Sequence, residues 1–240
     1  MNPSDSIPLM FLAVQLLALA VACLIFGVLL FLQRRVRRTK APQPIPSPAV
    51  LFQPIAPLRP TTWVAVRAAT PAAVQNALGL NRSAPCSWLE GMAGEHEFFI
   101  SQRIHGWVII TGAGLPGPED DVDACFHFLI TLSRKLGHVQ FFHAEAISHH
   151  HAWARLDDGY VTRAYAWAGK TVWNQGVKTA AEIEFKMKCF GYGDESFSEK
   201  VVEMNRDKVP LLATRWSLDP ARVRLLKKMD GIAGQSSQVF

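Results

Sequence analysis

An uninterrupted apolar stretch near the N-terminus dominates the pattern of hydrophobic and polar positions. Residues 9–32 contain no charged side chain, and Gln15 is their only strongly polar residue. A helix rises about 1.5 Å per residue, so this stretch is long enough to cross a hydrocarbon core of about 30 Å. The sequence therefore predicts a short external N-terminus and a single transmembrane helix within residues 1–33.

Charged residues flank this stretch unevenly. Five cations follow it, whereas Asp5 is the only charged side chain before it. Because cations beside a span favour the cytoplasmic side, we expect the N-terminus outside and the rest of the chain in the cytoplasm. The protein would then be a single-pass protein of the inner (plasma) membrane, with the lipid bilayer as one partner. The membrane-orienting residues are Arg34, Arg35, Arg37, Arg38 and Lys40.

Small residues recur four positions apart within the apolar stretch. Ala18 with Ala22, and Cys23 with Gly27, would allow two such helices to approach closely. The pattern is compatible with a homodimer formed through the transmembrane helix. Alanine is common in any membrane span, so the simpler interpretation is a span without a specific helix partner.

Residues 34–60 combine the basic segment with a proline-rich linker. Seven prolines fall between Ala41 and Pro60. Proline lacks an amide hydrogen and restricts the residue before it, which excludes both a helix and a central strand. An extended spacer is expected. A ligand for a proline-binding module is the alternative, but a plain linker explains the composition more simply.

Alternating and helical periodicities begin at Thr61 and predict one cytoplasmic α+β domain over residues 61–229. We expect a mainly antiparallel sheet of about six or seven strands covered by helices, because short connections require antiparallel neighbours. Residues 230–240 show no clear pattern and are expected to form a flexible tail. Strands are predicted at residues 61–67, 97–104, 107–111, 139–147, 152–156, 160–167 and 171–175.

Cap residues and apolar stripes predict the helices. Two of the predicted starts, Thr179 with Glu182 and Ser196 with Glu199, have the spacing of a capping box. Alternation along residues 160–167 places Tyr160, Thr162, Ala164 and Ala166 on one face of the strand. Because this face is mostly small, we expect a helix to pack on it. Helices are expected at 71–78, 119–136, after Thr179, after Ser196 and from Pro220 to about Met229.

The charge balance limits the class of partner. The formal net charge is +5, and residues 1–40, with five cations and one anion, supply four of these charges. The folded domain is therefore nearly neutral, which argues against a nucleic-acid partner because phosphate binding requires clustered cations. The four cysteines are far apart and form no C-x-x-C motif, so free thiols in a reducing compartment are expected.

Residues 112–117 match the G-x-G-x-x-G fingerprint of dinucleotide-binding proteins. Three features oppose this interpretation. The preceding strand is predicted to belong to a hairpin, Pro116 and Pro118 remove backbone amides, and the carboxylates within residues 119–123 would repel a phosphate. No cofactor is therefore expected. The acidic run is explained by the positive end of the helix that follows it.

Five of the eight histidines lie in residues 138–151. On a strand, His143 and Glu145 would share one face, and with His149–His151 they could bind zinc, nickel or copper. Three consecutive side chains point in different directions, so a polar turn explains the run more simply. The favoured interpretation is therefore no metal, with His143, Glu145 and His150 as the candidate ligands.

Four aromatic residues fall on predicted strands and would form a binding surface if they shared an exposed face. Packing in the core is the simpler role for them in a domain of this size. No G-x-S-x-G or S-x-x-K motif marks a nucleophile. The four aromatic residues are Trp153, Tyr165, Trp167 and Trp173.

The favoured function is non-catalytic: an anchored adaptor or assembly module that binds another protein. The first alternative is a membrane-tethered hydrolase, with or without a metal, that uses His143, Glu145 and His149–His151. The second is a sensor that binds a small ligand within the sheet. Convergent polar groups in a pocket would favour the hydrolase, an exposed apolar patch the adaptor, and an enclosed apolar cavity the sensor.

Overall fold

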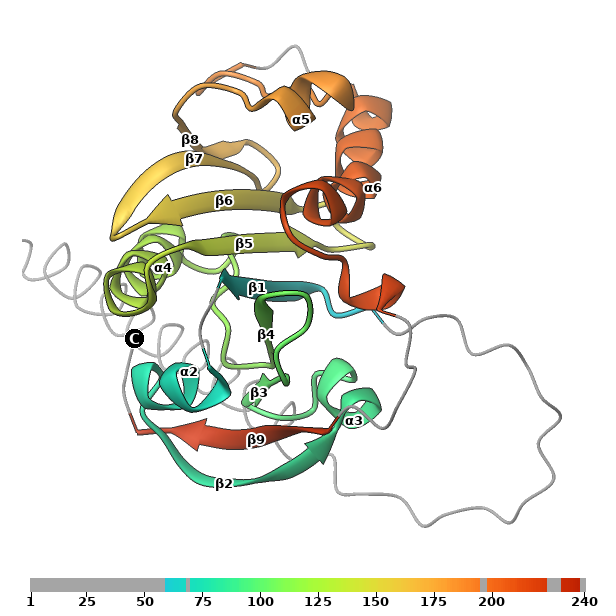
Figure 1. Cartoon of the computed structure of the whole chain (residues 1–240). Helices are drawn as coiled ribbons and strands as arrows, with labels where there is room; N and C mark the ends of the chain where they lie inside the picture. Colours follow the sequence, from blue (N-terminus) through green and yellow to red (C-terminus); the bar gives the residue numbers. More distant parts are fainter. Residues whose placement is uncertain (1–58, 68–69, 195–197, 224–229, 238–240) are drawn as a thin grey trace, which may run out of the picture. The chain divides into compact units, whose positions relative to one another are not determined.

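The computed structural model describes residues 59–67, 70–194, 198–223 and 230–237. Within these ranges nine strands form one antiparallel sheet, in the order β2-β9-β3-β4-β1-β5-β6-β7-β8 (Figure 1). The α+β fold class and the antiparallel sheet are confirmed. The strands are β1 (Thr62–Arg67), β2 (Leu80–Ser87), β3 (Phe98–Ile100), β4 (Trp107–Thr111), β5 (Val139–Ala144), β6 (His151–Asp157), β7 (Tyr160–Trp167), β8 (Thr171–Gln175) and β9 (Asp230–Ser236).

Helices cover both faces of this sheet. α2 and α4 pack on one face, which we call the α4 face, whereas α3, α5 and α6 pack on the other, the α6 face (Figure 1). The helices are α2 (Pro71–Ala77), α3 (Trp88–Met92), α4 (Val122–Leu136), α5 (Ala180–Glu184) and α6 (Glu199–Trp216), followed by the short 3-10 helix η1 (Pro220–Arg222).

Alternation along β7 divides the core between the two faces. Ala164 and Ala166 belong to the core on the α4 face, and Tyr165 and Trp167 belong to the core on the α6 face. The small alanine side chains leave room for α4 to lie on β7, which confirms the predicted helix-packing face. Burial of both faces explains why the strands are rich in large apolar residues.

Local signals account for most of the element boundaries. The Asp121 side chain caps α4 by accepting hydrogen bonds from the amides of Asp123 and Ala124, both at 3.0 Å. The predicted two-residue turn between β3 and β4 is present, with positive φ at His105 (48°) and Gly106 (88°). This pair of positive angles matches the right-handed twist of a hairpin.

The expected flexible tail over residues 230–240 is wrong for Asp230–Ser236. This segment is β9, which pairs with β2 on one side and β3 on the other. Its partners lie more than a hundred residues earlier in the chain, so no local pattern indicates the strand. The predicted strand number is too low for the same reason, because β2 was not predicted either.

The helix predicted after Ser196 is present as α6, but its predicted cap is wrong. α6 begins at Glu199 after the N-cap Ser198, so Glu199 is the first helical residue and cannot close a capping box with Ser196. The helix predicted from Pro220 begins as the single turn η1, after which Val223 is extended with ψ 110°. The rest of that predicted helix, residues 224–229, lies outside the described residues.

The predicted transmembrane helix, the membrane-orienting cations and the proline-rich linker lie in residues 1–58, outside the described residues. Within the described ranges, none of the helices has the length and apolar character needed to cross a membrane.

Candidate functional sites

Glu145 is bound by its own loop between β5 and β6. Its Oε2 atom accepts hydrogen bonds from the amides of Ile147 (2.9 Å) and Ser148 (2.6 Å) and from the Ser148 hydroxyl (2.7 Å). These bonds, chiefly the Ser148 amide, lower the pKa of Glu145 to about 2. The carboxylate therefore stabilises the turn and is ionised at neutral pH.

His149 and His151, the outer two of the three consecutive histidines, have different surroundings. His149 lies in the loop with φ 58°, and its Nδ1 atom is 2.8 Å from Nη1 of Arg206. His151 is fully buried on β6, where its ring stacks on Trp153 at 5.9 Å. Burial lowers the pKa of His151 to about 4, so its ring is neutral at pH 7.

The buried His143 ring contacts two polar side chains that are partly exposed. Its Nδ1 atom is 2.8 Å from Oγ1 of Thr62, and its Nε2 atom is 3.3 Å from Oε2 of Glu119. The second contact is an ion-pair distance without hydrogen-bond geometry. Burial lowers the pKa of His143 to about 4 and raises the pKa of Glu119. Thr62 and Glu119 were not predicted as partners of His143.

Thr62 opens onto a cleft of about 530 Å³ between β1 and the loop that follows β4. Gly112 and Ala113 of the G-x-G-x-x-G segment also line this cleft. A Cβ on Gly112 would lie 2.3 Å from the carbonyl oxygen of Glu97, and Gly112 has φ 135°. Glycine is therefore required here by the approach of the neighbouring backbone.

The strand before this glycine-rich segment pairs antiparallel with both β1 and β3. The hairpin that argued against a dinucleotide-binding βαβ unit is thus confirmed. Among the described residues, no group of three or more His, Cys, Asp or Glu side chains lies close enough together to hold a metal ion. The candidates His143, Glu145 and His150 accordingly do not converge on a common point.

The four aromatic residues do not form an exposed binding surface, because all four are buried and pack in the core, which was the simpler role expected for them. Trp153, Tyr165 and Trp167 lie in the core of the α6 face, whereas Trp173 lies in the core of the α4 face. The helical segment around α5 covers the first group. Trp153 Nε1, for example, donates a 2.9 Å hydrogen bond to Glu182.

Arg163 and Glu182 form a fully buried ion pair between β7 and α5. Arg163 Nη2 lies 2.8 Å from Glu182 Oε1, and the two side chains are 2% and 0% exposed. Burial opposes ionisation of Glu182, but hydrogen bonds from Arg163 and Thr179 outweigh it and lower its pKa. The sequence indicated only the Thr179–Glu182 capping box, which is present.

Exposed apolar side chains gather where α5 meets α6. Met204 and Leu211 follow one stripe of α6 with Lys208 and Arg215, at positions i, i+7, i+4 and i+11. Met204 is 45% exposed, Leu211 is 37% exposed, and Ile183 on α5 is 64% exposed.

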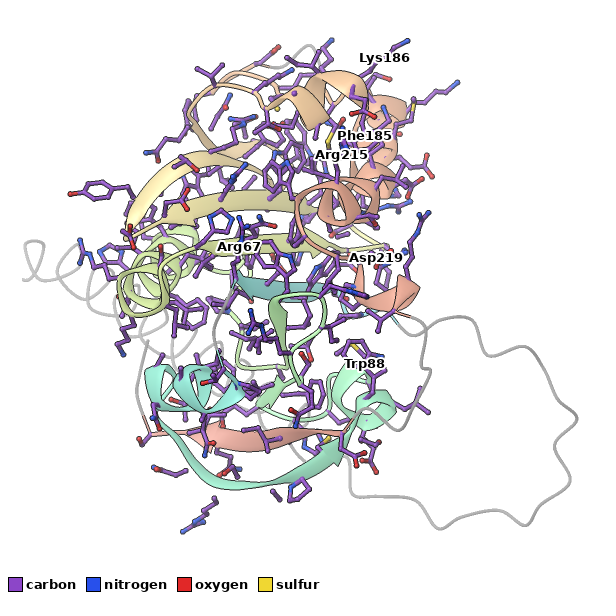
Figure 2. All side chains as sticks on the ribbon, viewed as in Figure 1. Arg67, Trp88, Phe185, Lys186, Arg215 and Asp219 are labelled. Carbon is purple, nitrogen blue, oxygen red and sulfur yellow. The ribbon has the colours of Figure 1, made fainter. Side chains whose placement is uncertain are left out.

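Two contacts connect this stripe to the α5 segment. Lys208 Nζ donates to the carbonyl of Lys186 at 3.3 Å, and Arg215 Nε lies 3.5 Å from Glu184. Figure 2 labels Phe185, Lys186 and Arg215 in this region. We call this area the α5–α6 surface and define it by Ile183, Lys186, Met204, Lys208, Leu211 and Arg215.

Comparison of the chain with models of known protein families, with curated proteins and with solved structures finds no match. Function is therefore argued from the fold and its surfaces.

Proposed function

We propose that the protein is a membrane-anchored adaptor whose domain binds another protein through the α5–α6 surface. The observation that supports this proposal is the exposure of Ile183, Met204 and Leu211 on two helices that contact each other. Single exposed apolar residues are common on protein surfaces, whereas a cluster rimmed by charged residues is typical of interaction sites.

The other large exposed apolar residues of the described chain are spread over separate segments. They are Ile147 (91% exposed) in the β5–β6 loop, Val177 (87%) after β8, Tyr160 (77%) at the start of β7, Tyr192 (65%) after α5 and Leu89 (54%) on α3. Met204 and Leu211, by contrast, share one stripe of α6, and Ile183 lies on α5, which contacts α6. Burying their exposed apolar area against a partner contributes roughly 25 cal/mol per Å².

The N-terminal sequence supports the membrane part of the proposal. The uncharged stretch 9–32 and the five cations after it match the pattern of a span with a cytoplasmic C-terminal domain. The proline-rich residues 41–60 would then separate the domain from the bilayer. Such a spacer allows the α5–α6 surface to meet either a membrane-bound or a cytoplasmic partner.

Site-specific crosslinking in cells tests this proposal. A photo-reactive amino acid at Ile183 or at Leu211 should give the same adduct with one partner protein. The same residue at Ile147, which is more exposed but lies outside the surface, should not give that adduct. Identical adducts from all three positions, or none from Ile183 and Leu211, would contradict the proposal.

A purified pair then sharpens the test. Once the adduct identifies the partner, Ile183→Glu should weaken its binding to the full-length chain by roughly tenfold or more. Ile147→Glu is the matched control and should leave binding unchanged. Both substitutions are at exposed positions, where changes in stability are usually within about 0.5 kcal/mol.

One observation favours a second candidate function, hydrolysis. The Thr62 hydroxyl, the neutral His143 ring and the Glu119 carboxylate form a continuous chain beside the 530 Å³ cleft. A hydroxyl bonded to a neutral imidazole is the arrangement of an activated nucleophile. Hydrolysis of a p-nitrophenyl ester that is lost in Thr62→Val would support this candidate, and activity retained by Thr62→Val would exclude it.

A further inference from the structure

A hollow of about 520 Å³ lies where β1, β4 and the end of α6 meet. Arg67 ends β1, Trp107 begins β4, and the two are directly opposite in the register of the strands. Figure 2 labels Arg67 at the end of β1. The residues that line the hollow are Arg67, Arg103, His105, Gly106, Trp107 and Trp216. We call this hollow the Arg67 pocket.

The Arg67 pocket contains cations and no carboxylate among its lining residues. Several other described arginines are paired: Arg59 and Arg222 with Asp219, Arg163 with Glu182, Arg206 with Asp207, and Arg215 with Glu184. Neither the Arg67 nor the Arg103 guanidinium has an ion pair or a side-chain hydrogen bond with another described residue. Two guanidinium groups with free donors therefore face one hollow.

The two tryptophans of the pocket are fixed by neighbours outside it. The Trp107 ring lies 5.6 Å from the ring of His138, the residue before β5. The Trp216 ring lies 5.9 Å from the ring of Phe142, and the Trp216 carbonyl accepts a 3.3 Å hydrogen bond from Gln140. Both rings are half-buried, so each keeps part of its surface available. Aromatic surfaces held in this way lose little conformational entropy on binding.

Nearby charge does not neutralise the pocket. His138, just before β5, accepts a backbone hydrogen bond from Arg67, and its side chain pairs with Asp157 on β6. The Asp157 carboxylate is therefore already paired with the His138 ring. His138 lies between Asp157 and Arg67 across the sheet. An anion that enters the pocket meets the donors of Arg67 and Arg103 without competition from a lining carboxylate.

We infer that the Arg67 pocket binds a small molecule that joins an anionic group, carboxylate or phosphate, to a planar ring. Guanidinium groups bind carboxylate and phosphate oxygens through paired, charge-assisted hydrogen bonds. The indole rings of Trp107 and Trp216 offer surfaces on which a planar group can stack. The volume of the hollow is within the range of about 300–1,000 Å³ that is usual for small-molecule sites.

A ligand in the Arg67 pocket goes beyond the proposed adaptor function. The pocket and the α5–α6 surface share no residue, so a negative result for one leaves the other standing. The charge pattern along the sequence does not indicate this pocket, because the net charge of the domain is close to zero while the local charge of the pocket is positive.

Isothermal titration of the full-length purified chain tests the inference with four probes. Adenosine monophosphate and indole-3-acetate carry both a ring and an anion, whereas adenosine carries only a ring and inorganic phosphate only an anion. At least one of the first two should bind at a single site with Kd below about 1 mM, and roughly tenfold or more tighter than adenosine or phosphate. Which of the two binds distinguishes a phosphate ligand from a carboxylate ligand.

Variants connect binding to the pocket. Arg67→Ala and Arg103→Ala should each weaken binding roughly tenfold, because each removes a charge-assisted contact. Arg155→Ala is the matched control: Arg155 also lies on a strand without an ion pair, but it does not line the pocket, so binding should stay unchanged. Thermal melting of every variant shows that the fold is retained.

Four results would overturn the inference. The first is no saturable binding of either ring-bearing anion up to about 5 mM. The second is phosphate alone binding as tightly as adenosine monophosphate, which would leave the tryptophans without a role. The third is equal weakening by Arg155→Ala and Arg67→Ala, which would indicate a diffuse charge effect. Binding of an acidic peptide in place of both small probes would also overturn it and would make the pocket part of a protein interface.

Discussion

Arg163 and Arg67 project from the same face of the sheet and have opposite surroundings. Arg163 on β7 is 2% exposed, and its guanidinium donates to Glu182, Asn174 and Cys189. Arg67 on β1 is exposed, and its side chain donates to no described residue. An arginine whose donors are satisfied inside the fold holds elements together, whereas one whose donors are free remains available to a ligand.

The same contrast separates the histidine-rich segment from the Arg67 pocket. Glu145 and His149 are engaged by their own loop and by Arg206, and His151 is buried. Residue types that suggest chemistry are therefore not sufficient to define a site. The decisive property is whether the fold has already used the hydrogen-bonding capacity of the side chain.

Removing the buried arginine, Arg163, should have the largest effect on stability. Arg163→Ala leaves the Glu182 carboxylate, 0% exposed, without its cation, and should lower the free energy of unfolding by about 3–5 kcal/mol. Urea denaturation of the full-length chain measures this loss. The double variant Arg163→Met with Glu182→Leu is the control and should lose less, because no unpaired charge stays buried. A loss below about 1 kcal/mol in Arg163→Ala would contradict the structural role.

Much of the sheet was predictable because its signals are local. The alternation in residues 160–167 and 171–175, with a turn between them, defines β7 and β8 with the observed bounds. The acidic start, apolar stripe and terminal glycine of α4 act within one segment in the same way. Such patterns reflect burial of one face and helix-end electrostatics, which neighbouring residues determine.

β2 and β9 could not be predicted because pairing, and not composition, makes them strands. β2 is mostly exposed and contains Pro85, and β9 contains Gly231 and Gly234. A Cβ at Gly231 would lie 2.4 Å from the carbonyl oxygen of Ile100, so close packing against β3 requires glycine there. Neither segment has the alternation of a half-buried strand.

The candidate sites were less predictable than the sheet. His143 was singled out correctly as a polar residue of β5, but its partners Thr62 and Glu119 come from other elements. The Arg67 pocket likewise combines β1, the β3–β4 turn and the end of α6. Residues brought together from three separate segments leave no spacing pattern in one sequence.

Histidines allow the comparison of buried and exposed groups to be tested through pH. The pKa of His151 falls from 6.5 to about 4 on folding, chiefly through burial. The unfolded chain therefore binds the extra proton between these values, so the contribution of His151 to stability is complete above pH 6.5 and is lost as the pH falls towards 4. The groups that face this ring are His143, His150 and Arg206.

His151→Phe isolates this effect, because phenylalanine keeps the stacking on Trp153 and cannot titrate. We compare the free energy of unfolding of the variant with that of the parent chain at two pH values. The difference should favour the variant by about 2 kcal/mol more at pH 4.5 than at pH 8. Urea denaturation at both pH values measures this difference. His127→Phe, at an exposed position of α4, is the control and should show a smaller pH dependence. Parallel stability curves for His151→Phe and the parent would contradict the burial of a neutral ring.

A smaller effect is expected when Arg163 loses one of several partners. Cys189→Ala removes the sulfur that accepts from Arg163 Nη2 at 3.0 Å, while Glu182 and Asn174 still accept from the guanidinium. The free energy of unfolding should fall by about 1 kcal/mol. The free energy of unfolding of Cys189→Ser should fall less, because its hydroxyl can accept the same hydrogen bond. A loss as large as that of Arg163→Ala would show that the thiol, and not the carboxylate, holds the network together.

Arg67→Ala should have the smallest effect on stability. Its guanidinium is exposed and unpaired within the described chain, so truncation leaves no buried partner behind. The free energy of unfolding should change by less than about 0.5 kcal/mol, and Arg103→Ala should behave in the same way. Urea denaturation without ligand measures both. A loss of more than about 1 kcal/mol in Arg67→Ala would mean that the pocket supports the fold, and the contrast with Arg163 would then disappear.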